Sequence, residues 1–250
     1  MIKRMMLLFV VISSFQTLSA QWKLVWSDEF AYNGLPDPSK WGNEVGFIRN
    51  NELQYYTSGR LQNTEVKDGF LYITARKEAY ENAAYTSASI TTEGKYSFTY
   101  GKAEARMKLP KGQGMWPAFW MLGQNIREIG WPKCGEIDIM EHINSEDILY
   151  GTLHWHNEKH VSDGTKTPCT VGEFHTYSIE WEPKSIKWFL DGKQYHEVNI
   201  ADAVNNTEEF QRPFYMILNL AIGGDWPKNP DSTTIFPDAV VVDYVRVYQK

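Results

Sequence analysis

Short runs in which apolar and polar residues alternate dominate this chain. In "GKAEARMKLP", residues 101–110, the apolar side chains of Ala103, Ala105, Met107 and Leu109 alternate with charged ones. Side chains alternate between the two faces of a β-strand, so this run predicts a strand with one buried face. The segments "FLYITA", "FHTYSIEW" and "AVVVDYVRVYQ" have the same character. We therefore expect an all-β fold.

Turn residues separate these runs. Asp191-Gly192 lies between two strand-like segments in "KSIKWFLDGKQYHEV" and predicts a hairpin. The unbroken apolar run "FYMILNLAI" indicates a strand that is buried on both faces. Many short strands at roughly even spacing favour a β-sandwich. We expect one domain over residues 21–250, because a segment of this length can bury a large core.

Residues 1–20, "MIKRMMLLFVVISSFQTLSA", have the features of a secretory signal peptide. Lys3 and Arg4 precede the apolar run Met5 to Ile12, and Ser19-Ala20 supply small residues for cleavage. The apolar run is too short to span a bilayer as a helix. A buried N-terminal helix is the alternative. We expect a secreted or periplasmic protein with no membrane association after cleavage.

The net charge limits the possible binding partners, and the cysteine content limits the possible disulfides. Without Lys3 and Arg4, 23 basic residues stand against 31 acidic ones, which argues against nucleic-acid binding. Cys134 and Cys169 are the two cysteines. In an exported protein they can form a disulfide or remain as two free thiols, and the sequence leaves both options open.

Tryptophans cluster in "GMWPAFWML" and "GWPKCG", directly before an acidic segment. Alternation places Trp116, Ala118 and Trp120 on one face of a strand, with Phe119 and Met121 on the other. Indole rings that face a groove can stack against the C–H faces of sugar rings. The alternative is that these rings fill the core of the sandwich.

The acidic segment "CGEIDIMEH", residues 134–142, contains Glu136, Asp138 and Glu141. Glu136 and Asp138 share one face of a strand, but regular alternation would point Glu141 into the apolar layer. An unpaired carboxylate there is costly. A β-bulge at Ile139-Met140 would reset the alternation and bring all three carboxylates to one side.

Three carboxylates on one face suit glycoside hydrolysis. The bulged step from Glu136 to Glu141 covers ~13 Å between Cα atoms, and side chains leaning together could approach the ~5–5.5 Å carboxyl separation of a retaining glycosidase. One glutamate would attack the anomeric carbon and the other would protonate the leaving oxygen. A solvated acidic face, a divalent-metal site with His142, and a sugar-binding module without catalysis fit the same residues less well.

The segment "GEIDIMEH" resembles the Glu-x-Asp-x-x-Glu signature of glycoside hydrolase family 16 in its bulged, laminarinase-like form. The similarity extends over nearly all of residues 21–250, through "WSDEF", "NNELQYYT", "YTSASITTEGKYSFTYGKAEARMKLPKGQGMWPAFWML", "GWPKCGEIDIMEH", "FHTYSIEW", "NLAIGGDWP" and "VDYVRVYQ". The resemblance implies a β-jelly-roll of two curved antiparallel sheets, with a cleft on the concave face.

By position, the resemblance implies that Glu136 is the nucleophile, Asp138 the assisting carboxylate and Glu141 the general acid/base. It implies a retaining enzyme that cuts internal β-1,3 bonds of laminarin-type glucans. We expect the protein to be a monomer. The alternatives are mixed-linkage β-glucan, agarose or carrageenan as substrate, or a non-catalytic glycan-binding protein.

Further residues match positions that contact sugars in similar enzymes, namely Asn51, Trp116, Trp120, Trp131 and His154. A structural role for His154 is the alternative. Asn219 lies in the buried run, so it faces the cleft or bonds a neighbour. Ser89 stands where many relatives carry an arginine, so that arginine's sugar contact is absent or replaced.

Asp243 alternates with valines in "VVVDYVRVY", which predicts a carboxylate on an apolar face that needs a counter-charge, a donor or an ion. The resemblance implies a structural Ca²⁺ held by Glu29, the carbonyl of Gly69 and Asp243, and oxygen ligands suit calcium. A salt bridge without metal is the alternative. No cofactor is needed for the chemistry.

Overall fold

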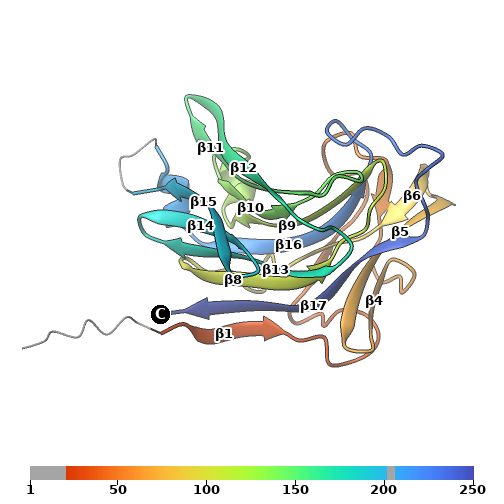
Figure 1. Ribbon diagram of the computed structural model, residues 1–250, viewed down its shortest axis with the longest axis horizontal. Helices are drawn as coiled ribbons and strands as arrows, with labels where there is room; N and C mark the ends of the chain where they lie inside the picture. The colour runs from red at the N-terminus through yellow and green to blue at the C-terminus, as the bar shows by residue number, and fades with distance from the viewer. Residues whose placement is uncertain (1–20, 202–205) are drawn as a thin grey trace, which may run out of the picture.

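The computed structural model describes residues 21–201 and 206–250, so the expected signal peptide, residues 1–20, lies outside the described residues. Two β-sheets pack face to face in a jelly-roll, and Figure 1 shows β9, β10 and β16 stacked over β8, β13 and β17. In the described part of the chain, helical structure is limited to α1 (Ile126–Ile129) and the 3₁₀ turn η1 (Glu208–Gln211). No helix among these residues is long and apolar enough to cross a membrane.

One layer, here called the cleft sheet, carries the acidic strand near its middle. Its order is β12 (Lys159–Pro168), β11 (Ile148–Asn157), β10 (Glu136–Glu141), β9 (Met115–Gly123), β16 (Phe214–Ile222), β7 (Ser89–Thr91) and β2 (Gly42–Glu44). All its pairings are antiparallel. Every residue of β16 is buried, as its unbroken apolar run predicts.

The other layer, here called the outer sheet, runs in the order β15 (Lys193–Asn199), β14 (Ser185–Leu190), β13 (Phe174–Glu182), β8 (Gly101–Lys108), β17 (Asp238–Gln249), β5 (Phe70–Tyr80), β6 (Ala83–Ser87) and β3 (Gln54–Tyr56). In addition, β1 (Lys23–Asp28) pairs with β17, and β4 (Thr64–Lys67) pairs with β5. The short pairing of β3 with β6 is parallel. Asp191-Gly192 forms the β14–β15 turn as predicted, with both residues at positive φ.

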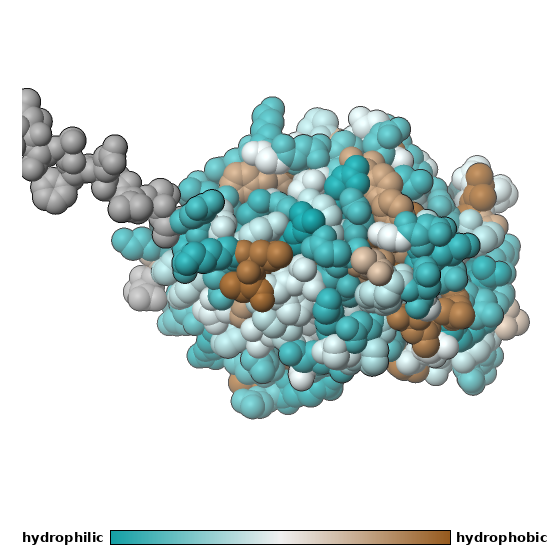
Figure 2. Space-filling model, turned by 90° about the horizontal axis from the view of Figure 1, so that it is seen from below, coloured by the Kyte–Doolittle hydropathy of each residue, from teal (hydrophilic) through white to brown (hydrophobic). Residues whose placement is uncertain are grey.

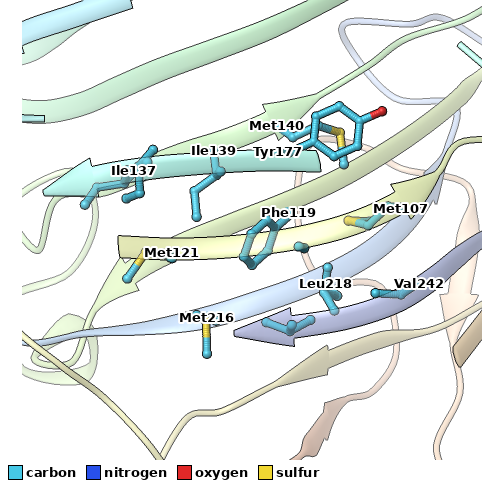
Figure 3. Packing of buried hydrophobic residues seen from close by; sticks show 14 of the residues in the cluster. Met107, Phe119, Met121, Ile137, Ile139, Met140, Tyr177, Met216, Leu218 and Val242 are labelled. Atoms are coloured by element: carbon cyan, nitrogen blue, oxygen red, sulfur yellow. The ribbon is translucent and has the colours of Figure 1, made fainter. Parts of the chain in front are cut away.

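The core lies between the two sheets, and the alternation in the sequence determines which side chains enter it. Ala103, Ala105 and Met107 of β8 are fully buried, as are Phe119 and Met121 of β9. Figure 3 shows Phe119 and Met121 among the buried side chains of this layer. The face on the β1 and β17 side is largely hydrophilic with small separate apolar patches (Figure 2).

Both cysteines are buried free thiols. Cys134 packs with Trp120 and Leu122 in a small second cluster that includes residues lining the cleft, whereas Cys169 belongs to the main core. The structure therefore selects the free-thiol alternative.

Candidate active site

Strand β10 contains the bulge that the sequence predicts. On the β9 side, Asp138 pairs with Trp120 and Met140 pairs with Phe119, so Ile139 is the extra residue. Ile139 and Met140 both lie in the core (Figure 3). The carboxylates of Glu136, Asp138 and Glu141 consequently line the same cleft.

The outer sheet supports this bulge. Two residues of β10, 139 and 140, lie opposite the single residue Gly151 of β11. A Cβ at Gly151 would come within 2.7 Å of the Trp188 ring. The absence of that Cβ admits the Trp188 indole, whose Nε1 donates to the backbone carbonyl of Asp138 at 2.8 Å. A buried backbone carbonyl at the disrupted part of the ladder thus finds a donor.

Glu136 begins β10 after a glycine that the local geometry requires. Gly135 has φ +76°, and a Cβ there would meet Phe214 at 2.8 Å. Trp131 Nε1 donates to Glu136 Oε2 at 2.8 Å, and His154 Nε2 lies 4.0 Å from Oε1. Burial and the charge of Asp138 raise the pKa of Glu136, while His154 and the Trp131 hydrogen bond act in the opposite direction.

Asp138 is the most deeply buried of the three acids, with 2% of its surface exposed. Its Oδ2 lies 3.2 Å from His154 Nε2. Burial and the charge of Glu141 raise the pKa of Asp138 well above its usual range. Asp138 therefore carries a proton more readily than an exposed aspartate would, which limits the charge repulsion between the glutamates on either side.

Glu141 receives a hydrogen bond from Trp116, whose Nε1 donates to Oε1 at 3.0 Å. Burial raises the pKa of Glu141 to about 7, and the Trp116 hydrogen bond partly offsets this effect. A carboxyl group that keeps its proton near neutral pH can act as a general acid. Each glutamate thus has its own indole donor.

The three acids lie in a cleft of about 510 Å³. It is formed by the cleft sheet and by the loops before β3 and around α1, and its lining includes Glu44, Ile48, Arg49, Asn50, Glu52, Glu93, Trp116, Ala118, Trp120, Leu122, Ile126, Arg127, Trp131, Tyr215 and Asn219. Four of the six predicted sugar-binding residues are in this lining: Trp116, Trp120, Trp131 and Asn219. The exceptions are Asn51 and His154.

The predicted tryptophans differ in how freely they face the cleft. Trp131 is 48% exposed, which leaves much of its ring available to a sugar. Trp120 is only 7% exposed, and the Arg49 guanidinium lies 4.9 Å from its ring centroid. Trp120 therefore supports Arg49 rather than offering an open platform, and Trp116 and Trp131 are the better placed rings.

Asn219 is bonded on both sides of its amide. Its Oδ1 accepts from Trp120 Nε1 at 2.7 Å, and its Nδ2 donates to the Tyr56 hydroxyl at 3.0 Å. Asn219 therefore bonds neighbouring side chains, which was one of the two alternatives from the sequence, and it also lines the cleft.

Asn51 lies in the loop before β3 and is exposed. Its Nδ2 donates to both carboxylate oxygens of Asp225 at 3.1 Å. This contact links the loop before β3 to the loop that carries Trp226, whose ring packs edge-on against Trp116 at 5.5 Å. Here Asn51 holds two loops together, and the structure places it outside the immediate cleft lining.

His154 and His142 have different surroundings. His154 faces Glu136 and Asp138, and its Nδ1 lies 2.8 Å from His160 Nε2 on β12. His142 points away from the acids, as alternation predicts. Its two ring nitrogens lie 3.0 and 3.1 Å from the backbone carbonyls of Ile148 and Asn144, which excludes it from a metal site with Glu141.

An arginine also occupies the region of Ser89. Ser89 Oγ donates to Glu44 Oε2 at 2.6 Å, and Arg49 bonds the other oxygen of Glu44. Position 89 has no arginine, but the guanidinium of Arg49, from a different loop, lies in the same region.

The face of Asp243 differs from the sequence prediction. A register shift in β17 between Val242 and Tyr244 resets the alternation, so Asp243 does not share the buried face of Val245. Its Oδ2 accepts from Arg106 at 2.5 Å. The apolar-face prediction was wrong because a second bulge turns this carboxylate outward.

The suggested calcium ligands are near one another in the outer sheet. Asp28 pairs with Val245 and Leu71 pairs with Val242, which brings Glu29 and Gly69 alongside the same part of β17. However, Arg246 donates to both Glu29 oxygens at 2.9 and 2.7 Å. Since both carboxylates have arginine partners, the set fits a calcium ion only if both ion pairs open.

Sequence reasoning missed Arg49, Glu44, His160 and Trp188. Their roles depend on contacts between segments that are far apart in the chain, such as the loop before β3 and strand β9. Trp226 had a signal, since it lies in "NLAIGGDWP", but the pattern did not indicate its contact with Trp116.

Comparison with known proteins agrees with this geometry. The model of "Glycosyl hydrolases family 16" matches residues 51–246. The chain is 44% identical to a "Beta-glucanase" of Rhodothermus marinus, over 91% of this chain and 85% of that protein.

Solved structures give the same picture. The catalytic domain of an endo-1,3-beta-glucanase (laminarinase) from Thermotoga petrophila has a TM-score of 0.82 and 43% identity, covering 92% of this chain and 98% of the other. A variant of LamA from Z. galactanivorans, in complex with laminaritriose and laminaritetraose, has a TM-score of 0.82 and 40% identity. That match covers 90% of this chain and 98% of the other.

Proposed function

Since the chain belongs to glycoside hydrolase family 16, we propose that Glu136 and Glu141 perform its chemistry, the hydrolysis of internal β-1,3-glucosidic bonds. The chain is an endo-1,3-beta-glucanase that acts on laminarin-type glucans by a retaining mechanism. The observation that carries the residue assignment is the bulged strand β10, which places two glutamates, each with its own indole donor, in one cleft.

In the first step, the Glu136 carboxylate attacks the anomeric carbon and the glycosidic C–O bond breaks. Glu141 gives its proton to the leaving oxygen, so the departing sugar leaves as a neutral alcohol. Burial and the charge of Asp138 raise the pKa of Glu136 to about 8, and the Trp131 N–H and nearby His154 offset only part of this, so the attacking form of Glu136 is a minor population at neutral pH. Burial favours the protonated form of Glu141.

In the second step, Glu141 acts as a base. It takes a proton from a water molecule, whose oxygen attacks the anomeric carbon and displaces Glu136. The two inversions restore the original β configuration. Asp138, buried between the glutamates, carries a proton readily and so keeps the total negative charge of the cluster low.

Hydrolysis of laminarin, followed by reducing-sugar release, tests this function. Wild-type protein should release reducing ends, and Glu136→Ser should lose turnover while keeping its melting temperature, since the core face of β10 is untouched. Near-normal rates in Glu136→Ser would show that the nucleophile assignment is wrong. Retained laminarin binding without release by wild-type protein would indicate a glycan-binding protein instead.

The finer substrate preference is a proposal. We expect laminarin to be cut faster than lichenan, agarose or carrageenan. Besides the catalytic acids, the cleft contains Glu44, Glu52 and Glu93, and Arg49 and Arg127 pair with the first and the last of these. The lining as a whole keeps an excess of acidic groups, which disfavours sulfated chains such as carrageenan. A higher rate on carrageenan than on laminarin would contradict this preference.

Export, oligomeric state and calcium also stay proposals. Secretion into the medium or periplasm should depend on residues 1–20, and fractionation of cells that express the chain with and without them tests this. We expect a monomer, which light scattering can check. We also expect that the protein binds neither nucleic acid nor membrane after cleavage. A structural calcium ion would be supported if chelation lowered the melting temperature and added calcium restored it.

A further inference from the structure

Three side chains bring potential ligand atoms together at the floor of the cleft. His154 Nε2 lies 3.2 Å from Asp138 Oδ2 and 4.0 Å from Glu136 Oε1, and the ligand atoms all lie within 4.8 Å of one another. Asp138 Oδ2 is buried and accepts no hydrogen bond among the described residues. A buried carboxylate oxygen without a donor is costly unless a proton or a cation reaches it.

We propose that Glu136, Asp138 and His154 form a binding site for one Zn²⁺ or similar transition-metal ion, and that this ion inhibits the enzyme. Zinc takes nitrogen and oxygen ligands at about 2.0–2.2 Å in a tetrahedron, which places neighbouring ligand atoms about 3.3–3.5 Å apart. The His154–Asp138 separation is close to this spacing. The remaining ligand separations, up to 4.8 Å, must shorten by at most about 1.5 Å, which a rotation of the Glu136 side chain can supply.

The surroundings prepare two of the ligands. Trp131 Nε1 bonds Glu136 Oε2 and leaves Oε1, the oxygen nearer His154, for an ion. On the far side of the His154 ring, Nδ1 lies 2.8 Å from His160 Nε2. A hydrogen bond from Nδ1–H to His160 leaves the Nε2 lone pair directed at the site, which is the arrangement that holds a histidine ligand in place.

Other histidine–carboxylate pairs lack a third ligand. His175 lies 2.6 Å from Asp191, and His196 lies 3.4 Å from Asp163. In the part of the chain that the structure describes, neither pair belongs to a cluster of three possible ligands. These pairs provide matched controls for zinc binding.

The position of the site determines its effect. Glu136 and Asp138 line the cleft, so the open coordination position faces the space that a glucan occupies. An ion bound to Glu136 Oε1 engages the lone pair that must attack the sugar. Zinc should therefore compete with the substrate, whereas Ca²⁺ and Mg²⁺, which prefer oxygen ligands, should inhibit far less.

Zinc binding can be measured without relying on turnover. Glu141→Gln keeps all three ligands but lacks the general acid, so calorimetric titration of this chelator-treated variant with ZnCl₂ separates binding from catalysis. We expect one zinc ion per chain. Adding His154→Gln should weaken binding at least tenfold, while adding His175→Gln should leave it unchanged.

Inhibition of the wild-type enzyme provides the second measurement. ZnCl₂ should lower the rate of laminarin hydrolysis, a chelator should restore it, and higher laminarin concentrations should raise the zinc concentration required. No binding to Glu141→Gln, or equal loss of binding with His154→Gln and His175→Gln, would overturn the proposal. Because binding is measured on an inactive variant, a failure of the proposed function would not be mistaken for a failure of this site.

Discussion

The two indole donors in the cleft should each control one side of the pH–activity profile, the acidic limb or the alkaline limb. Trp131 bonds Glu136, which must be ionised to attack, and Trp116 bonds Glu141, which must be protonated to act as an acid. Both hydrogen bonds lower the pKa of the carboxyl group that receives them. Replacing either tryptophan with phenylalanine should therefore raise one pKa and leave the other nearly unchanged.

The sign of each shift follows from the role and the pKa of the carboxyl group. The active form needs Glu136 ionised and Glu141 protonated, yet the pKa of Glu136 is about 8 and that of Glu141 about 7. The population of this form therefore rises through the lower pKa, that of Glu141, and falls through the higher one, that of Glu136. Trp131→Phe should move the alkaline limb to higher pH and widen the active pH range, and Trp116→Phe should move the acidic limb to higher pH and narrow it.

The expected size comes from the strength of these hydrogen bonds. A hydrogen bond to a charged group contributes about 1.5–3 kcal/mol, and 1.36 kcal/mol corresponds to about one pKa unit, so about 1–2 units is the upper bound. Trp131 is 48% exposed, and water can replace much of its hydrogen bond. We therefore expect about 0.5 unit for Trp131→Phe and about 1 unit for the more buried Trp116.

Initial rates of laminarin hydrolysis between pH 4 and pH 9, expressed as kcat/KM, measure both limbs. Trp226→Phe is the matched control, because its ring contacts Trp116 and Tyr150 rather than a catalytic carboxylate. It should change KM without moving either limb. If Trp131→Phe moved the acidic limb, or if both variants left the profile unchanged, the assignment of the two donors would be refuted.

Three further substitutions test the acid cluster, the cleft wall and the bulge. Burial raises the pKa of Asp138, so this residue lowers the free energy of unfolding increasingly as the pH rises from the unfolded pKa of about 3.9 toward the folded pKa, and not below the unfolded value. Asp138→Asn should therefore raise the melting temperature at pH 8, by about 2–4 °C per kcal/mol, and not at pH 3.5. An equal gain at both pH values would contradict this. Arg49→Ala should raise KM for laminarin about tenfold, equivalent to about 1.4 kcal/mol, while Arg60→Ala, a similar arginine over Tyr80 outside the cleft, should leave KM unchanged. Trp188→Phe leaves the Asp138 carbonyl without its donor and should lower stability by about 1–3 kcal/mol together with kcat, so a melting temperature within 1 °C of wild type would argue against this support of the bulge.

The sequence predicted the parts of the fold that depend on local alternation. The bulge in β10 was predictable because Glu141 would otherwise face the core with Ile137 and Ile139. The strand β8 and the hairpin at Asp191-Gly192 were predictable for the same local reason. These features need no knowledge of which segments meet in space.

Asp243 shows where this reasoning fails. It gives the same signal as Glu141, a carboxylate out of step with its apolar neighbours, yet the sequence interpretation kept the strand regular and assigned an ion or counter-charge. The structure resolves the conflict with a register shift and an ion pair to Arg106. One pattern thus has several physical solutions, and contacts with other strands decide between them.

The cleft wall was predictable only in part for a related reason. The tryptophans of β9 were correctly placed on the face opposite Phe119, but the position of Arg49 over Trp120 depends on how the loop before β3 folds back over the sheet. A sequence pattern identifies the face of a ring, and it does not indicate which distant side chain covers that face.

The support of the β10 bulge by Trp188 and Gly151 has an evolutionary consequence. The spacing between Asp138 and Glu141 can change by one codon without turning the acid away from the substrate, because a regular strand and a bulged strand both keep it on the same side. The longer spacing, however, exposes a carbonyl that a different sheet must satisfy, and it needs a small residue opposite for the indole to enter. An insertion in the catalytic strand and the identities of two residues elsewhere in the chain should therefore be inherited together, as a set, when such enzymes diverge.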